Sequence, residues 1–143
     1  MPRLSVWCLR TALLYLGLGF TFGAVMLAAP GLHLPATTLR LRPLHIELLL
    51  VGWMVQLAFG AAYWILPRQR GAGRGNERLA WAALLLLNFG VLAVGVGGLM
   101  GAAGPVIAVG RAAELIAAVA FAGHAWPRAR LYTPLKNPSS GSV

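Results

Sequence analysis

Hydrophobic residues along this chain gather in four long blocks that are separated by short polar segments. The blocks cover residues 11–29, 44–66, 79–101 and 105–126. Each has about the 20 residues that a helix needs to cross the hydrocarbon core of a bilayer. The blocks are continuously apolar, unlike barrel strands, and a helix satisfies its own backbone hydrogen bonds in lipid. The pattern therefore predicts an all-α fold, a four-helix transmembrane bundle with up-down topology.

Polar segments at the ends and between the blocks predict how the chain is organised around the membrane. We expect a cytoplasmic N-terminus over residues 1–10, a membrane domain over residues 11–126 and a disordered cytoplasmic tail over residues 127–143. Pro43 stands where the second helix should begin, and proline suits a first turn because its missing N–H has no partner there. The first block could also be a signal peptide, but its length favours an uncleaved span.

Composition supports the membrane assignment, because 59% of the residues are hydrophobic and 10% are charged, against about a quarter charged in soluble domains. The net charge of +9 would suit a nucleic-acid partner, but the arrangement of the charges argues against one. Nine of the twelve cations fall on one side of the predicted spans, and only Arg40 and Arg42 fall on the other. This positive-inside bias predicts both termini in the cytoplasm, a multi-pass location in the cytoplasmic (inner) membrane, and no nucleic-acid binding.

The second block contains polar residues that apolar segments of this length usually exclude. At about 100° per residue, His45, Gln56 and Tyr63 share one helix face, whereas Glu47 points about 200° away from His45. An ionisable group inside a bilayer is costly, so it should face protein, water or a bound group. His45 is only about one turn inside the predicted outer boundary, where water or a lipid headgroup could also satisfy it.

The fourth block supplies a second polar set. Arg111 and Glu114 are three residues apart, so they can pair along one helix face. With His45 and Glu47 they could form a polar cluster in the outer half of the bundle, and Asn88 of the third block could reach Glu114. The alternative is an internal ion pair that only fixes the register of the helices.

Few residues are available for other chemistry. The chain has no Asp and a single Cys, so the sequence offers no Ser–His–Asp set, no internal disulfide and no thiolate metal cluster. His124 lies about 28 Å from Pro105 along the fourth helix, at about 1.5 Å per residue, so we expect it at the cytoplasmic interface beside Trp126. It therefore cannot bind one heme or metal ion together with His45. An enzyme that works alone is not expected from this inventory.

The run HIELLLVGWMVQLAFGAAYWILP, residues 45 to 67, resembles the second span of subunit I in the heme–copper oxidase superfamily. It is most similar to the nitric oxide reductase and C-family oxidase branches and to NnrS-like membrane heme proteins. In those proteins a His near the outer end of this span ligates the low-spin heme, and aromatic residues and a Pro follow it. The resemblance implies that His45 is an axial ligand of a heme b iron. Gln56 and Tyr63, on the same helix face, are further candidate cofactor contacts.

Departures from that family limit the expected function. The family's subunit needs further His ligands on later spans, and this chain has only three His residues. Reduction of oxygen or nitric oxide by this chain alone is therefore not expected. A second axial ligand would come from His45 of another copy in a homodimer, from His33, from a partner subunit, or would be missing.

Three functions remain open from the sequence. The first is a heme b membrane protein for electron transfer or gas sensing. The second is a cofactor-free accessory or assembly subunit that binds the subunits of a respiratory complex. The third is a small proton-coupled transporter that uses Glu47 or Glu114.

Overall fold

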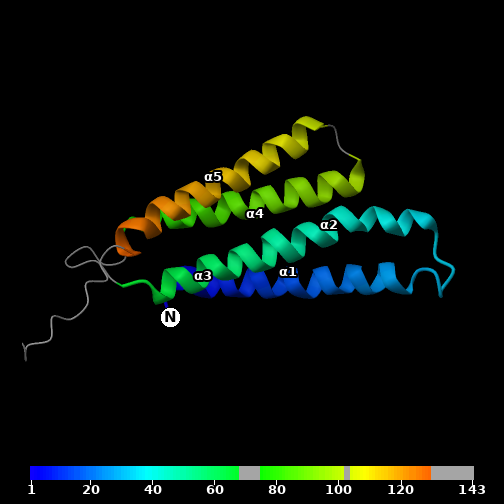
Figure 1. The fold of residues 1–143 in the computed structure, drawn as a ribbon, viewed down its shortest axis with the longest axis horizontal. Helices are drawn as coiled ribbons and strands as arrows, with labels where there is room; N and C mark the ends of the chain where they lie inside the picture. The colour runs from blue at the N-terminus through cyan, green and yellow to red at the C-terminus, as the bar shows by residue number, and fades with distance from the viewer. Residues whose placement is uncertain (68–74, 102–103, 130–143) are drawn as a thin grey trace, which may run out of the picture.

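Helices make up the regular structure of the described chain (Figure 1). The computed structural model describes residues 1–67, 75–101 and 104–129. Within those ranges four helical segments are long and apolar enough to cross a membrane: Arg3–Ala28, Ala36–Ile65, Glu77–Met100 and Gly104–Ala129. No strand occurs in the same residues. The predicted all-α class and the four candidate spans are therefore confirmed.

Three of the segments are single α-helices: α1 (Arg3–Ala28), α4 (Glu77–Met100) and α5 (Gly104–Ala129). α4 begins after the N-cap Asn76, whose side-chain oxygen accepts a hydrogen bond from the backbone N–H of Leu79 at 3.2 Å. It ends at Gly101, which has a left-handed backbone with φ of 66°. The sequence thus fixes both ends of α4 with local signals.

The second segment changes helix type along its length. It consists of the 3-10 helix η1 (Ala36–Leu41), α2 (Arg42–Glu47), the π-helix η2 (Leu48–Val55) and α3 (Gln56–Ile65). Pro43 lies in the first turn of α2, as predicted. A π-helix bonds residue i to residue i+5, so it turns less per residue than an α-helix. The uniform rotation of about 100° per residue that was assumed for this segment is therefore wrong across η2.

Helix ends differ from the predicted blocks in two places. α1 begins at Arg3 rather than at residue 11. The helix therefore includes the segment before the apolar block, with its basic residues. α5 continues to Ala129, so the first residues of the predicted tail are helical. The rest of that tail, and most of the loop between the second and third spans, lie outside the described residues.

Glycines allow α1 to approach the second segment closely. A Cβ on Gly19 would lie 2.8 Å from Cγ of Leu49, and a Cβ on Gly60 would lie 2.8 Å from Cβ of Cys8. The later residue of α1 thus meets the earlier residue of the second segment, so the two run antiparallel. Figure 1 shows α1 alongside α2 and α3, with α4 and α5 as the other pair.

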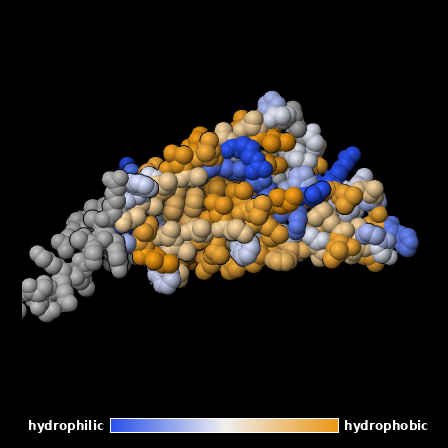
Figure 2. All heavy atoms as spheres, viewed as in Figure 1, coloured by the Kyte–Doolittle hydropathy of each residue, from blue (hydrophilic) through white to orange (hydrophobic). Residues whose placement is uncertain are grey.

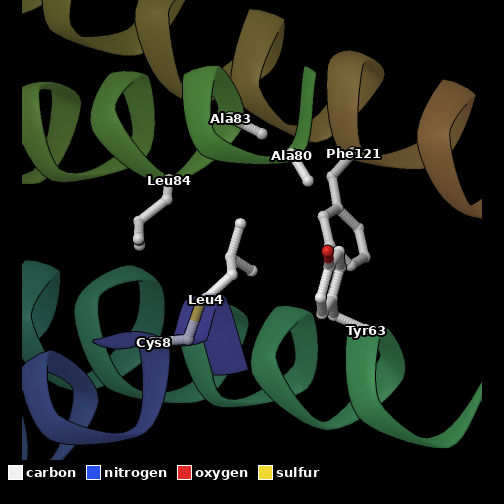
Figure 3. Close-up of a cluster of buried hydrophobic side chains, with 7 residues drawn as sticks. All are labelled: Leu4, Cys8, Tyr63, Ala80, Ala83, Leu84 and Phe121. Carbon is white, nitrogen blue, oxygen red and sulfur yellow. The ribbon is translucent and has the colours of Figure 1, made fainter. Parts of the chain in front are cut away.

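Two clusters of buried apolar side chains connect these pairs. Figure 3 shows the first, in which side chains from α1, α3, α4 and α5 converge: Leu4, Cys8, Tyr63, Ala80, Ala83, Leu84 and Phe121. The second cluster consists of Tyr15, Leu44, Leu48 and Val91. Leu44 packs so closely on α4 that a Cβ on Gly95 would lie 2.7 Å from its Cδ1. The clusters thereby hold α1 and the second segment against α4.

Large apolar side chains also cover the outside of the bundle. Figure 2 shows hydrophobic residues over most of the visible face. Members of this surface are more than half exposed: Leu14, Phe20, Ile65, Leu85, Leu115 and Val119. Apolar surface left in water costs about 25 cal/mol per Å², whereas lipid tails solvate it. The four apolar helices therefore indicate a multi-pass membrane protein in contact with a lipid bilayer.

Candidate functional site

An ion cluster, which consists of Glu47, Arg111 and Glu114, joins α2 to α5. Nη2 of Arg111 donates to Oε2 of Glu47 at 2.7 Å, and Nη1 donates to Oε1 of Glu47 at 3.1 Å. Nη1 also donates to Oε2 of Glu114 at 2.8 Å. Glu47 therefore uses both of its carboxylate oxygens, in the bidentate geometry that makes an arginine–carboxylate pair strong. Glu114 uses only one.

Glycines on α4 and α5 create the space for this cluster. A Cβ on Gly90 would lie 2.5 Å from Cγ of Glu114 and 2.8 Å from the backbone oxygen of Gly110. The close approach of α4 and α5 buries Glu114, and its Oε1 has no hydrogen-bond partner among the described residues. A buried oxygen without a partner is costly in a medium without water. The ion cluster is thus positioned by backbone contacts rather than by flexible loops.

A pocket of about 370 Å³ opens beside the ion cluster. Its lining residues come from α2, α4 and α5: Arg42, Pro43, Ile46, Glu47, Val94 and Arg111. The side chain of Arg111 is 53% exposed, whereas that of Glu47 is 3% exposed. The guanidinium therefore lies between the buried carboxylates and the surface of the bundle. In the view of Figure 2, a few hydrophilic residues interrupt the hydrophobic surface of the bundle.

His45 does not join the ion cluster, which corrects the grouping expected from the sequence. Its Nδ1 lies 2.7 Å from the backbone oxygen of Gly19, and its ring fills the space where a Cβ on Gly23 would stand 2.7 Å from Cε1. The reason is rotational: His45 and Glu47 are two residues apart on α2, about 200° around the helix. His45 therefore faces α1 while Glu47 faces α4 and α5.

The ring of His45 has the hydrogen-bond arrangement of a metal-binding imidazole. A carbonyl oxygen only accepts, so Nδ1 carries the hydrogen and donates it to Gly19. In a neutral imidazole Nε2 then keeps its lone pair, and it makes no hydrogen bond within the described part of the chain. Histidines that bind metals are usually fixed in this way through their other nitrogen. The contact with Gly19 thus fixes the tautomer of His45, with Nε2 as the nitrogen that carries the lone pair.

No multi-residue metal site is found around His45 in the described part of the chain. Residues 1–67, 75–101 and 104–129 contain no group of three or more His, Cys, Asp or Glu that could hold a metal ion. His33 has a left-handed backbone with φ of 52° in the turn after α1. Gln56 and Tyr63 lie eleven and eighteen residues beyond His45 on the same segment, several helical turns along its axis. The structure therefore does not bring Tyr63 together with His45.

Gln56 belongs instead to a polar chain in the middle of the bundle, which consists of Thr11, Tyr15, Gln56 and Asn88. Tyr15 donates to Oδ1 of Asn88 at 2.7 Å, and Nδ2 of Asn88 donates to Oε1 of Gln56 at 3.0 Å. Nε2 of Gln56 donates to the hydroxyl of Thr11. The side chain of Gln56 is fully buried. This chain of hydrogen bonds ties α1, α3 and α4 together.

The predicted contact between Asn88 and Glu114 is not formed. Asn88 also donates to the backbone oxygen of Leu84 at 2.8 Å, so its amide is committed within the polar chain. Glu114 packs instead at Gly90, two residues further along α4. Two residues correspond to about 200° of rotation, so these positions face opposite sides of the helix.

An arginine cluster, which consists of Arg128, His124 and Tyr63, lies at the other end of the bundle and was missed from the sequence. Arg128 is fully buried and donates to three backbone oxygens at the end of α3: Tyr63 at 3.0 Å, Leu66 at 2.6 Å and Pro67 at 3.1 Å. Its position in a basic tail suggested only a topological role. The sequence feature that indicates this cluster is the spacing of four residues between His124 and Arg128, which places them on one helix face.

His124, which was expected at the interface beside Trp126, lies at this end of the bundle with its side chain buried. Its Nδ1 lies 3.1 Å from the backbone oxygen of Asn76, and its Nε2 lies 3.1 Å from Nη1 of Arg128. Its ring also stacks on Tyr63, with centroids 5.2 Å apart. His124 and His45 contact opposite ends of the bundle, so they cannot bind the same iron or metal ion.

Comparisons with known proteins add no relative. The chain matches no protein-family model, no curated protein and no solved structure.

Proposed function

We propose that this chain is a small heme b protein of the cytoplasmic membrane, in which His45 is an axial ligand of the iron. Its four helices cross the membrane in up-down order, with both termini in the cytoplasm. The proposal rests on the resemblance of residues 45 to 67 to an oxidase span and on the charge distribution of the sequence. One structural observation supports the ligand role: the hydrogen bond from Nδ1 of His45 to Gly19 leaves Nε2 available.

Bound heme would supply one-electron transfer or the binding of a small gas molecule, and the chain's own residues would position it. Gly19 fixes the tautomer of His45, and Gly23 gives its ring room against α1. Catalytic reduction of oxygen is not part of the proposal, because His124 lies at the opposite end.

A cofactor-free subunit of a respiratory complex is the second candidate. It is favoured by the exposure of Arg111, a cation about two turns inside α5 whose side chain is 53% exposed at the side of the bundle. A partner helix that carries a carboxylate could cover this surface. In this reading the hydrogen bond between His45 and Gly19 is a helix–helix contact without a cofactor.

Absorption spectroscopy of the purified protein tests the first proposal. Protein extracted from heme-sufficient cells in a mild detergent should show a Soret band, and His45→Ala should lose most of it. His33→Ala serves as the matched variant, because it removes another His but leaves the fixed imidazole of His45 in place. It should retain heme, with a shifted spectrum if His33 is the second ligand.

Two outcomes would contradict heme binding at His45. The first is a colourless wild-type protein despite an excess of heme, and the second is an unchanged Soret band in a folded His45→Ala protein. The same preparation tests the second candidate. If that candidate is correct, the wild-type protein should be colourless and oxidase subunits should co-purify with it, but they should not co-purify with Arg111→Gln.

A further inference from the structure

The ion cluster contains one more acid than base. Arg111 carries one positive charge, and Glu47 and Glu114 would carry two negative charges if both were ionised. Both carboxyl groups are buried, Glu47 at 3% and Glu114 at 9% exposure. An uncompensated charge is expensive to hold away from water in a membrane protein. The three groups are most stable when their charges sum to zero.

Other charged groups near the cluster do not remove this imbalance. Arg42 is the only other charged residue of the second segment that lines the pocket, and it is an exposed side chain that forms no ion pair among the described residues. α4 contributes only glycine and aliphatic side chains here, since its charged residues lie in its first turn. His45 faces α1 instead. Among the described residues, Arg111 is therefore the only basic group that pairs with these two carboxylates.

We propose that the ion cluster binds one exchangeable proton, shared by the carboxyl groups of Glu47 and Glu114 in the resting state. Glu47 is bonded through both oxygens to Arg111, whereas Oε1 of Glu114 is buried and has no partner among the described residues. A neutral carboxyl without a partner costs much less than a buried charge without one. The ligand of this site is H⁺ itself. Its release leaves the cluster with one net negative charge, and no other reactant is needed.

The pocket beside the cluster gives this proton a way out. Glu47 and Arg111 both line it, and Arg42 lies at the same opening. Water in the pocket can therefore reach Glu47, the one of the two carboxyl groups that lines it. The proton exchanges with the aqueous side on which α2 begins. This inference uses only the chain's own carboxyl groups and does not depend on heme.

The small number of acids makes the proposal directly measurable. Glu47, Glu77 and Glu114 are the only acidic side chains of the whole chain. Infrared spectroscopy resolves the C=O stretch of a protonated carboxyl, and dodecyl maltoside is a detergent without interfering ester groups. At neutral pH the wild-type protein should show one protonated carboxyl per chain, which disappears reversibly as the pH is raised.

Substitutions should lower or raise the intensity of this band. Glu114→Gln and Glu47→Gln should each abolish it, because one remaining carboxylate then pairs with one arginine. Arg111→Gln should roughly double it, because two buried carboxyls then have no base. Glu77→Gln is the matched control, since Glu77 is an exposed residue of the first turn of α4, and it should leave the band unchanged.

A wild-type protein with no protonated carboxyl at neutral pH would overturn the proposal. So would a band that survives Glu47→Gln or Glu114→Gln in a protein with wild-type helix content. If these variants do not fold, the pH titration of the wild-type band alone decides between the two results.

Discussion

Glycine residues opposite polar side chains make this bundle possible at the residue scale. Gly23 accommodates the ring of His45, and Gly90 accommodates the stem of Glu114. Any larger residue at either position would displace a group that the proposed functions require. In lipid, such small residues also provide the close packing that drives helix association. The same positions thus serve both assembly and the polar sites.

Replacing Gly90 by Ala should destabilise the protein by about 1–3 kcal/mol, the usual cost of overpacking a core. The added Cβ would meet both a side chain and a backbone oxygen of α5, and backbone cannot move aside cheaply. Gly17→Ala is the matched control, because a Cβ there has open space around it. It should be neutral or stabilising by up to about 1 kcal/mol, since Ala favours helix over Gly.

Unfolding in SDS from a mild detergent, followed by the fluorescence of the five Trp residues, measures both changes. Equal stabilities of Gly90→Ala and Gly17→Ala would show that α4 and α5 do not pack as closely as described.

Residue-level prediction succeeded where neighbours in sequence are neighbours in space. Arg111 and Glu114 form the predicted pair because a spacing of three residues places them on one face. The partners of Asn88 and His45 could not be read from the sequence, because they depend on how the helices are rotated against each other. In a block that is apolar on every side, periodicity does not distinguish the face that packs on protein from the face that meets lipid.

At the scale of helices, the second segment is the most irregular element. Its four parts differ in winding. The π-helix η2 separates Glu47 of the ion cluster from Gln56 of the polar chain. π-helices are rare and occur frequently at functional sites. Length and hydropathy predicted that this segment spans the membrane, but not the change of winding, since nothing in the run LLLVGWMV distinguishes the two helix types.

The end of α3 depends on an arginine from another helix. The last carbonyl groups of a helix have no partner within it. Arg128 of α5 donates to the carbonyl of Tyr63 in the last turn of α3 and to those of Leu66 and Pro67 just after it. The positive charge also suits the negative end of the helix dipole. Arg128 is therefore a C-terminal cap for α3, supplied from across the bundle.

Arg128→Lys should lower stability by about 1.5–3 kcal/mol, the value of one lost hydrogen bond from a charged donor. An ammonium cannot reproduce the planar fork that reaches several carbonyl groups at once. Arg10→Lys is the matched control, because Arg10 is exposed on α1. The SDS unfolding assay should separate the two variants. An Arg128→Lys protein as stable as Arg10→Lys would show that the cap contributes little.

At the scale of the whole molecule, polar groups occur at three depths of an otherwise apolar bundle. His45 and the ion cluster lie near the start of α2, the polar chain lies in the middle, and the arginine cluster lies at the far end. The last two are saturated by hydrogen bonds within the chain and stabilise the bundle. The first level contains the available Nε2 of His45 and the unpartnered oxygen of Glu114. Binding is therefore proposed at that end of the molecule.

A heme at His45 would also determine the assembly of the protein. With His124 at the opposite end, a second His ligand at the same depth is available from another copy across a two-fold axis along the membrane normal. A heme shared between the His45 residues of two chains gives one iron per two chains. A heme that is bound by a single His45 gives one iron per chain.

The heme content of the purified protein is the most direct test of heme binding at His45. The pyridine hemochrome assay, set against a quantitative amino-acid analysis of the same sample, gives moles of heme b per mole of chain. Heme binding at His45 should give one heme per chain or one per two chains, with the content falling close to zero in His45→Ala. A folded wild-type protein from heme-sufficient cells that contains no heme b would contradict it.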